Sequence, residues 1–344
     1  MTDTVLLVDI GGTHARARLM EVSGDLFVDR QILKENISTV SDKPSLFAII
    51  SDFQSQPGSR IVSSVLSFAG PVRNDSITMT NWPNTDNISL GEMAALGLPR
   101  DRTIFINDME AAANGLIAYK MGMVELEVRE LYAPKDPAYL HFNNSILIIP
   151  GTGVGIAAVI LPRADEPSQS PAHISCEIQH TTVSELDEKY SDLVTGLKLD
   201  LNKTMLSWED FVSGRGLENI YRILSRSSAG QTGEKLTAAD IAKNAIAGID
   251  NTSMAALDCY YSIAGRLTQV VALAFQPFAG IYLAGGTTRK NLPFIGGSGY
   301  MENLHNNPVR EELLKTFPVY LMPEYMNLIG AMYLANTQIR ASKK

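Results

Sequence analysis

The chain has 344 residues, of which 45% are hydrophobic and 19% are charged, and its formal net charge is −8. A single hydrophobic core stops growing at roughly 250 to 300 residues, so we expect two packed domains. The acidic balance argues against a broad basic surface for nucleic acid or anionic lipid, and it favours chemistry on a small molecule.

Cysteine content and apolar runs bear on where the chain works. Two cysteines, Cys176 and Cys259, are too few for a disulfide framework or a four-ligand zinc site, which favours a reduced, cytoplasmic chain. The first residues, MTDTVLLVDIGG, include no basic segment, and their apolar run is too short for a signal peptide. Residues 264–283 are apolar but contain Arg266 and Pro277, so we expect a buried helix followed by a strand, with no membrane partner.

The first predicted elements are two strands around a glycine turn. Residues 4–10 are apolar and β-rich, Gly11-Gly12 interrupts them, and residues 15–20 alternate between apolar residues and arginines. This pattern is typical of a hairpin. Further strands are predicted at 60–68, 76–80 and 103–106, and an Ala- and Met-rich helix at about 109–121.

The second half repeats this opening. A strand at 145–149, a turn at 150–155 and a strand at 156–161 indicate an internal duplication. Helices dominate until Pro277, and a buried strand then leads into Gly285-Gly286 before a last apolar helix at about 327–338. We predict a small α/β domain of residues 1–118 and 327–344 and a large α/β domain of residues 119–326, with no role assigned to 129–144.

The two glycine turns are candidate phosphate-binding sites. Backbone N–H groups at such turns can approach phosphate oxygens, although a single Gly-Gly turn is more simply an ordinary hairpin. The second turn, Gly151-Thr-Gly-Val-Gly155, strengthens the phosphate interpretation. It leads into a strand rather than a helix, which disfavours a dinucleotide fold, and no Gly-Lys-Ser or Gly-Lys-Thr indicates a Walker A loop. The order of motifs therefore favours an actin-like ATPase by analogy.

Candidate catalytic and sugar-binding residues lie between and after these turns. Asp108 ends a strand and begins a helix, where it can accept a proton from a hydroxyl group or, equally well, cap the helix. Glu177-Ile-Gln-His180 contains one histidine, which is unlike a zinc protease motif, and alone it resembles surface sequence. Glu209 comes two residues after Ser207, and either residue can start a helix.

In this order the motifs resemble the bacterial glucokinases of the hexokinase and actin-like ATPase superfamily, the group without the cysteine-rich zinc motif. VDIGGTHAR, INDMEAAANG, PGTGVGIA and LAGG resemble the first phosphate, catalytic, second phosphate and adenosine segments of that family. CEIQH and WEDFVSGRGLENIYR stand in the place of its sugar-binding segments, and NLIGAMYLA resembles its C-terminal helix. The resemblance spans most of the chain.

The resemblance implies a two-lobed α/β actin-like ATPase fold, also called ribonuclease H-like, with a central cleft. It implies ATP-dependent phosphorylation of glucose to glucose 6-phosphate in glycolysis, with Asp108 as the general base, and a homodimer. It places the sugar on Asn107, Asp108, Glu177, His180 and Glu209. It places ATP on Val8, Asp9, Ile10, Gly11, Gly12, Thr13, Thr152, Gly153, Gly285 and Gly286, with Mg²⁺ bound by Asp9, directly or through water.

Two departures leave alternatives open. His14 stands where the family usually has Asn, and Ile178-Gln179 replace a pair of glycines. A glutamine beside the sugar would suit another hexose such as N-acetylglucosamine or mannose, or it could lie outside the pocket. A non-catalytic sugar sensor on the same fold and an actin-like ATPase acting on protein partners are the rival functions.

Overall fold

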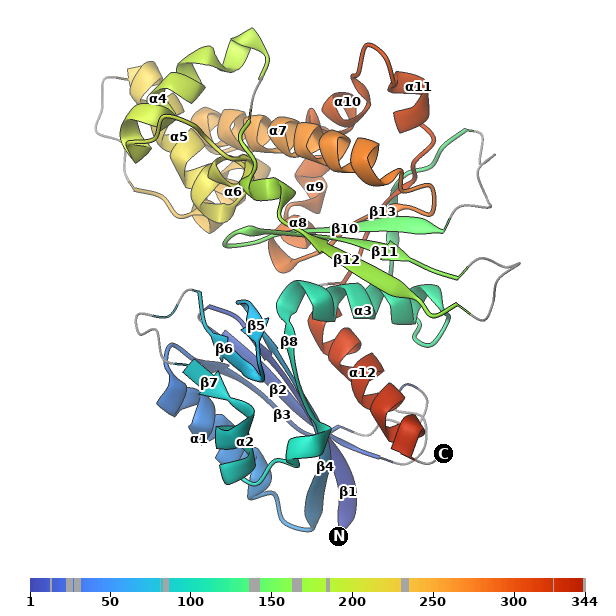
Figure 1. Cartoon of the computed structure of the whole chain (residues 1–344). Helices are drawn as coiled ribbons and strands as arrows, with labels where there is room; N and C mark the ends of the chain where they lie inside the picture. Colours follow the sequence, from blue (N-terminus) through green and yellow to red (C-terminus); the bar gives the residue numbers. More distant parts are fainter. Residues whose placement is uncertain are drawn as a thin grey trace. The chain divides into compact units, whose positions relative to one another are not determined.

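The computed structural model divides the chain into two compact units (Figure 1). Unit 1 comprises residues 1–126 and 325–344, and unit 2 comprises residues 127–324. The sequence-based division placed the two boundaries between the domains after residues 118 and 326. The structure describes residues 1–12, 14–22, 27, 32–80, 82, 87–135, 143–162, 169–183, 186–229, 235–323 and 325–342.

Unit 1 is built on a five-stranded mixed sheet in the order β3-β2-β1-β4-β8. Its strands are β1 (Thr2–Ile10), β2 (His14–Glu21), β3 (Ile32–Thr39), β4 (Ser59–Phe68) and β8 (Thr103–Asn107). The first three run antiparallel as a meander, and β4 and β8 run parallel to β1. A smaller sheet contains β5 (Val72–Arg73), β6 (Ser76–Thr78) and β7 (Asn87–Ser89). The predicted first hairpin is confirmed, and β3 was not predicted.

The helices of unit 1 begin at residues that satisfy their first N–H groups. α1 (Lys43–Gln54) starts after Asp42, whose carboxylate accepts from the Ser45 N–H, and α2 (Leu90–Ala95) starts with a capping box of Ser89 and Glu92. The short 3₁₀ helix η1 (Arg100–Arg102) precedes β8. Both start signals are readable in the sequence, but neither α1 nor α2 was predicted.

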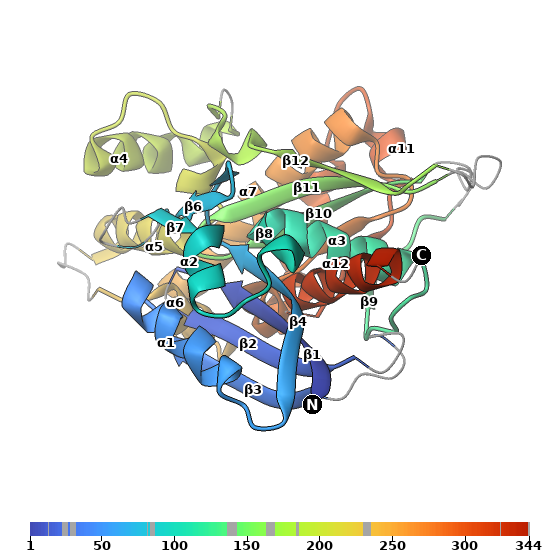
Figure 2. The same ribbon diagram turned by 60° about the horizontal axis from the view of Figure 1, so that its bottom comes forward.

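α3 (Asp108–Lys120) and α12 (Met326–Ser342) lie side by side in unit 1 (Figure 2). Their backbones meet at two glycines. A Cβ on Gly115 would contact the Met326 carbonyl, and a Cβ on Gly330 would contact the Ala111 carbonyl and the Gly115 nitrogen. Only glycine permits this approach, so the crossing brings the C-terminal segment into the core of unit 1.

Unit 2 repeats the arrangement of unit 1, with one strand added at the edge. Its sheet has the order β12-β11-β10-β13-β14-β9, in which β10, β11 and β12 are an antiparallel meander and β13 and β14 run parallel to β10. The strands are β9 (Arg129–Tyr132), β10 (Asn144–Pro150), β11 (Val154–Ile160), β12 (Ala172–Cys176), β13 (Ile281–Leu283) and β14 (Val319–Leu321). The predicted duplication is therefore visible as repeated topology. Within 129–144, β9 pairs with β14, and residues 136–142 lie outside the described residues.

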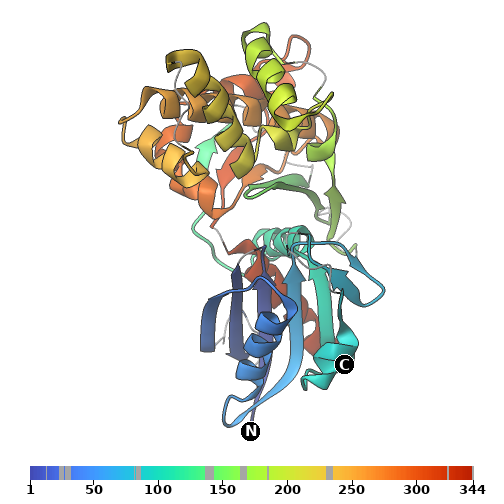
Figure 3. The ribbon, with the colours of Figure 1, turned by 90° about the vertical axis from the view of Figure 1, so that its left-hand side faces the viewer.

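The long buried helix α7 (Asn251–Phe275) organises the helical part of unit 2, and α5, α6 and α10 pack against it (Figure 3). The other helices are α4 (Ser191–Leu201), α5 (Gly214–Ala229), α6 (Ala238–Ile246), α8 (Gly286–Lys290), α9 (Leu292–Ile295), α10 (Tyr300–His305) and α11 (Glu311–Leu314), with 3₁₀ turns η2 (Ile178–His180), η3 (Glu188–Tyr190) and η4 (Trp208–Asp210). Gln276 ends α7 in the left-handed conformation at φ 46°, and Pro277 follows. The predicted buried helix followed by a strand is confirmed. Among the helices described, none has both the length and the apolarity needed to cross a bilayer.

Candidate active site

The carboxyl ends of three parallel strands meet at one edge of the unit 1 sheet. In the register of β1, β4 and β8, Asp9 pairs with Ser67 and Phe68 pairs with Asn107. Ligands of open α/β sheets bind beyond this edge. The strand order thus gathers Asp9, Asn107 and Asp108 from segments about a hundred residues apart in sequence.

Asp9 is held through one carboxylate oxygen. Ser67 Oγ donates to Asp9 Oδ1 over 2.7 Å, and Asn327 Nδ2 donates to the same oxygen over 3.0 Å. Burial raises the pKa of the Asp9 carboxyl, while these two hydrogen bonds and the charge of Arg16 act in the opposite direction. The net effect is a raised pKa, so the charged form of Asp9 is not fully stabilised by these neighbours. A cation near Oδ2, the oxygen that neither hydrogen bond uses, would stabilise it.

The residues at this edge fit a magnesium ion that is bound partly by substrate phosphates. No cluster of three or more His, Cys, Asp or Glu side chains suited to a metal occurs in the part of the chain that the structure describes. Mg²⁺ commonly binds one or two carboxylates together with substrate phosphates and waters. Asp9 is consistent with that mode of binding.

The structure decides which residue caps α3. Asn107 is the N-cap: its Oδ1 accepts from the Met109 N–H over 2.9 Å, and its Nδ2 donates to the Gly70 carbonyl over 3.1 Å. Asp108 is the first helical residue, and its Oδ1 also accepts from the Met109 N–H, over 2.8 Å. The capping role considered for Asp108 therefore belongs to Asn107.

The electrostatics of Asp108 suit a proton acceptor. Burial, followed by repulsion from the Asp9 carboxylate, raises the pKa of Asp108 from 3.8 to about 6. The hydrogen bond from Met109 opposes this shift without cancelling it. At neutral pH the group is mainly ionised, yet it is more basic than an ordinary aspartate.

The first glycine turn joins β1 to β2. Gly11 N donates to the His14 carbonyl over 2.9 Å and so closes a turn that contains Gly12. Val8 and Ile10 have fully buried side chains, so they can influence a ligand only by placing this turn. Thr13 lies outside the described residues.

The second glycine turn is tied to the start of α5. Gly151 N donates to the Gly153 carbonyl over 2.7 Å, and Gly214 N donates to the Gly151 carbonyl over 2.8 Å. Thr152 is exposed at the tip. Val154 N donates to Glu209 Oε2 over 3.1 Å. A predicted phosphate turn and a predicted sugar-binding carboxylate therefore share a hydrogen bond.

Gly285 and Gly286 lie next to this second turn. Because β13 pairs in parallel with β10, the segment after β13 emerges beside Pro150 and Gly151. Gly285 has φ 98°, and a Cβ there would lie 3.2 Å from both an Ile149 methyl carbon and the Pro150 carbonyl. Gly286 begins α8. The structure thus brings together two of the segments predicted to bind ATP.

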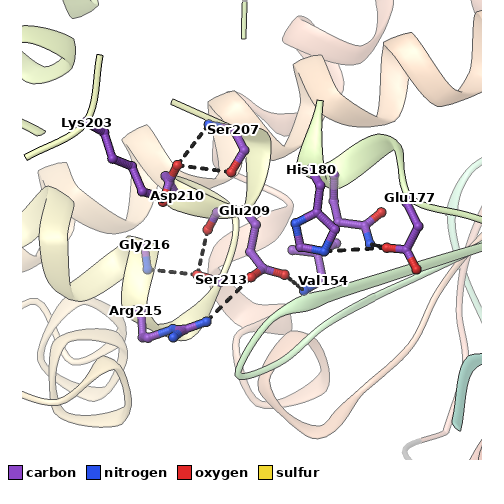
Figure 4. Close-up of polar contacts among 11 residues, drawn as sticks. Val154, Glu177, His180, Lys203, Ser207, Glu209, Asp210, Ser213, Arg215 and Gly216 are labelled. Atoms are coloured by element: carbon purple, nitrogen blue, oxygen red, sulfur yellow. Dashed lines mark hydrogen bonds and ion pairs between the residues drawn. The ribbon is translucent and has the colours of Figure 1, made fainter. Parts of the chain in front are cut away.

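The three sugar-binding candidates of unit 2 lie at two neighbouring 3₁₀ turns: Glu177 precedes η2, His180 ends it, and Glu209 lies in η4 (Figure 4). Val183 N donates to the Leu206 carbonyl, which joins the segment carrying Glu177 and His180 to the segment carrying Glu209. His180 Nε2 lies 3.5 Å from Glu177 Oε2. The second oxygen of Glu209, Oε1, lies 3.5 Å from Arg215 Nη2.

These segments lie within a match to a known family. The glucokinase family model matches residues 6–338. The chain belongs to the glucokinase family. The family interpretation of the ordered motifs is thereby confirmed.

Individual relatives of this glucokinase family member are distant but cover nearly its full length. Glucokinase of Pectobacterium atrosepticum is 28% identical, covering 96% of each chain, and glucokinase 1 of Trichomonas vaginalis is 25% identical, covering 95% of this chain and 92% of the relative. The crystal structure of Balamuthia mandrillaris glucokinase in complex with glucose is 21% identical with a TM-score of 0.83, covering 97% of this chain and 94% of that one. The predicted actin-like α/β fold class is confirmed.

Sequence reasoning missed three side chains that contact the candidate residues. Ser67 and Asn327 hold Asp9, and Arg215 approaches Glu209. Gln179 was singled out, but its contact with Glu177 was not predicted. Asn327 and Arg215 lie within segments that were matched to the family, but neither was singled out. The only local signal for Ser67 is its place near the end of a strand predicted to be apolar.

Proposed function

We propose that this glucokinase family member transfers the γ-phosphoryl group of ATP to the 6-hydroxyl of glucose, with Asp108 as the general base. Family membership supports the reaction. The single observation that supports the base is the place of Asp108 at the carboxyl edge of the unit 1 sheet, beside Asp9, with its pKa raised to about 6.

The raised pKa suits the task of Asp108. A general base works best when its pKa lies near the operating pH, because it is then both ionised and basic enough to take a proton. Asp108 Oδ1 accepts from the Met109 N–H, which orients the carboxylate. Asp108 would accept the hydroxyl proton as the sugar oxygen attacks phosphorus.

Phosphoryl transfer otherwise depends on holding the phosphates and neutralising their charge. Mg²⁺ supplies positive charge to the phosphate chain when bound, and Asp9 would hold it, with water in between if needed. ATP would be bound by the first turn (Gly11, Gly12, Thr13), the second turn (Thr152, Gly153) and Gly285-Gly286. Backbone N–H groups at these glycines are the donors that phosphate oxygens need.

The sugar would be bound by side chains that already have contacts with the protein. Asn107 uses one lone pair of its amide oxygen to cap α3 and one N–H to bond the Gly70 carbonyl, which leaves a second donor and a second lone pair for a hydroxyl. Glu177, His180 and Glu209 would bind the remaining hydroxyls. Side chains already held on one side lose less freedom when a ligand binds.

Glucose is proposed over N-acetylglucosamine or mannose. The alternative arose from Gln179, whose amide could have extended the pocket toward a modified sugar. In the structure Gln179 is buried, and its amide is bonded to Glu177. Cytoplasmic location, a place in glycolysis and a homodimer remain part of the proposal and rest on the resemblance and the two cysteines.

Steady-state kinetics of Asp108→Asn test the proposed base. Loss of a general base should lower kcat about 10²- to 10⁴-fold with a smaller change in the KM for glucose. Asp101→Asn, an exposed aspartate of the same unit, is the matched control and should leave kcat unchanged. Wild-type kcat in Asp108→Asn would overturn the role of Asp108.

The same assay with a panel of sugars tests the reaction. Glucose, mannose and N-acetylglucosamine are each supplied with ATP and Mg²⁺, and ADP release is also followed without sugar. Glucose-dependent ADP release is expected. ADP release that is independent of sugar would favour a protein-directed ATPase, and sugar binding without turnover would favour a sensor.

A further inference from the structure

Gln179 occupies an unusual position for a polar side chain. It stands at the second of the two positions where related glucokinases usually have glycine, within the 3₁₀ turn η2 that follows β12. Its side chain is only 4% exposed, although the residues on either side of it are partly or fully exposed. A buried glutamine in such a turn needs a reason, because an amide leaves water at a cost unless it finds partners.

Its donor bonds directly to Glu177. Gln179 Nε2 donates to Glu177 Oε2 over 2.6 Å, and His180 Nε2 lies 3.5 Å from the same oxygen. Two neighbouring side chains thus converge on one oxygen of Glu177 and leave Oε1 out of both contacts. A hydrogen bond to a charged acceptor is stronger than one between neutral groups, so the buried amide is the firmer anchor.

The Glu177 side chain is free to change its orientation unless a neighbour holds it. Its side chain is 79% exposed, and an exposed glutamate samples many rotamers that ligand binding would have to restrict. The amide of Gln179 is fixed by its burial, so it can hold the carboxylate in one orientation before a ligand arrives.

The other end of the Gln179 amide carries an energetic cost. Gln179 Oε1 is buried and accepts no hydrogen bond from the residues that the structure describes. Turning the amide around would place that oxygen against the Glu177 carboxylate, so the nitrogen faces Glu177. A buried polar atom without a partner opposes folding, and such costs persist mostly where function requires them.

We propose that Gln179 is a positioning residue that presets the Glu177 carboxylate for the sugar and so sets the affinity for glucose. This inference rests on the proposed function in that it takes Glu177 as a sugar ligand. Gln179 would act only through Glu177. It should therefore alter glucose binding and KM while leaving kcat, which depends on Asp108 and Asp9, nearly unchanged.

The test is a double-mutant cycle of Gln179→Met and Glu177→Ala in the full-length chain. Methionine fills a similar volume but removes both the donor and the unpaired acceptor. We expect Gln179→Met to weaken glucose binding in calorimetry and to raise KM about tenfold, as for loss of a hydrogen bond to a charged group, with kcat within about twofold. In the Glu177→Ala background the same change should have no further effect.

Two further measurements separate positioning from a structural role. The urea midpoint of Gln179→Met should equal or exceed that of the wild type, because the unpaired acceptor is gone, whereas a structural glutamine would lower it. Thr181→Ala removes a hydrogen bond to the Ile178 carbonyl in the same turn and is the local control, with an unchanged KM expected.

Four results would overturn the inference: an unchanged glucose affinity in Gln179→Met, a lower urea midpoint of that variant, an equal loss in the Glu177→Ala background, or an equal rise of KM in Thr181→Ala. Failure of the proposed function looks different. In that case the wild type neither binds nor phosphorylates glucose, or Glu177→Ala binds glucose as the wild type does.

Discussion

The two sheets share one topology but hold Asp108 and Glu177 in different surroundings. In unit 1, Asp9 and Asp108 lie at the ends of parallel strands, and burial raises the pKa of both. In unit 2, Glu177 precedes the 3₁₀ turn η2 and Glu209 lies in the 3₁₀ turn η4, with side chains that are 79% and 20% exposed. The sharpest contrast in the duplicated frame is therefore between Asp108, whose pKa burial raises, and the exposed Glu177.

This difference fits two separate roles, one in proton and phosphoryl transfer and one in binding the sugar. A carboxylate kept from water is more basic and responds strongly to a nearby cation, as proton and phosphoryl transfer require. A carboxylate in water is easily reached by a ligand, but it samples many rotamers that ligand binding must restrict. Each candidate carboxylate meets its need through an oxygen held by neighbouring groups, such as Ser67 and Asn327 for Asp9.

The largest expected effect is on turnover. Asp9→Asn keeps the oxygen that accepts from Ser67 and Asn327 but removes the charge, so kcat should fall about 10²- to 10³-fold with little change in the KM for glucose. Glu209→Gln in unit 2 should mainly raise that KM. Steady-state kinetics over glucose at saturating ATP and Mg²⁺ compare the two, and a larger kcat loss in Glu209→Gln would contradict the two separate roles.

The next effect concerns the helix crossing that brings Asn327 to Asp9. Gly330→Ala places a methyl group against the Ala111 carbonyl and the Gly115 nitrogen, and overpacking of this kind should destabilise unit 1 by about 2–3 kcal/mol. Gly296→Ala is the control, because a Cβ there meets nothing within 4 Å. Urea unfolding should show a lower midpoint for the first variant only; equal midpoints would show that the crossing can relax.

The smallest effect is a gain of stability that depends on pH. Folding raises the pKa of Asp108 from 3.8 to about 6, so the folded state holds the proton more tightly than the unfolded chain does. This contribution to stability is complete below pH 3.8 and is lost as pH rises through about 6. At pH 7.5 the ionised group therefore opposes folding, and Asp108→Asn should raise the free energy of unfolding by about 1–3 kcal/mol.

That gain should shrink as pH falls toward 5, where wild-type Asp108 is mostly protonated. Urea unfolding of the wild type and Asp108→Asn at a series of pH values measures it, with Asp101→Asn as the exposed control. A gain that does not vary with pH would show that burial of the charge is not its cause.

Local patterns in the sequence were enough to identify most elements of the two sheets. The alternation after Gly12 and the apolar run before Gly151 predicted both hairpins, because side-chain period and glycine turns are local properties. β3, β9, β12 and β14 escaped prediction. β3, β9 and β12 are edge strands with many exposed residues, so their hydrophobic signal is weak, and β14 is only three residues long.

The sequence by itself determined the order of the motifs and, with it, the family. It also marked Asp108 as a polar residue between a strand and a helix, without deciding whether that residue capped the helix. Only the tertiary structure assigned the cap to Asn107, placed Ser67 and Asn327 on Asp9, and turned Gln179 inward to Glu177. Periodicity reports the face on which a residue lies, whereas these contacts depend on how strands pair and helices pack across the chain.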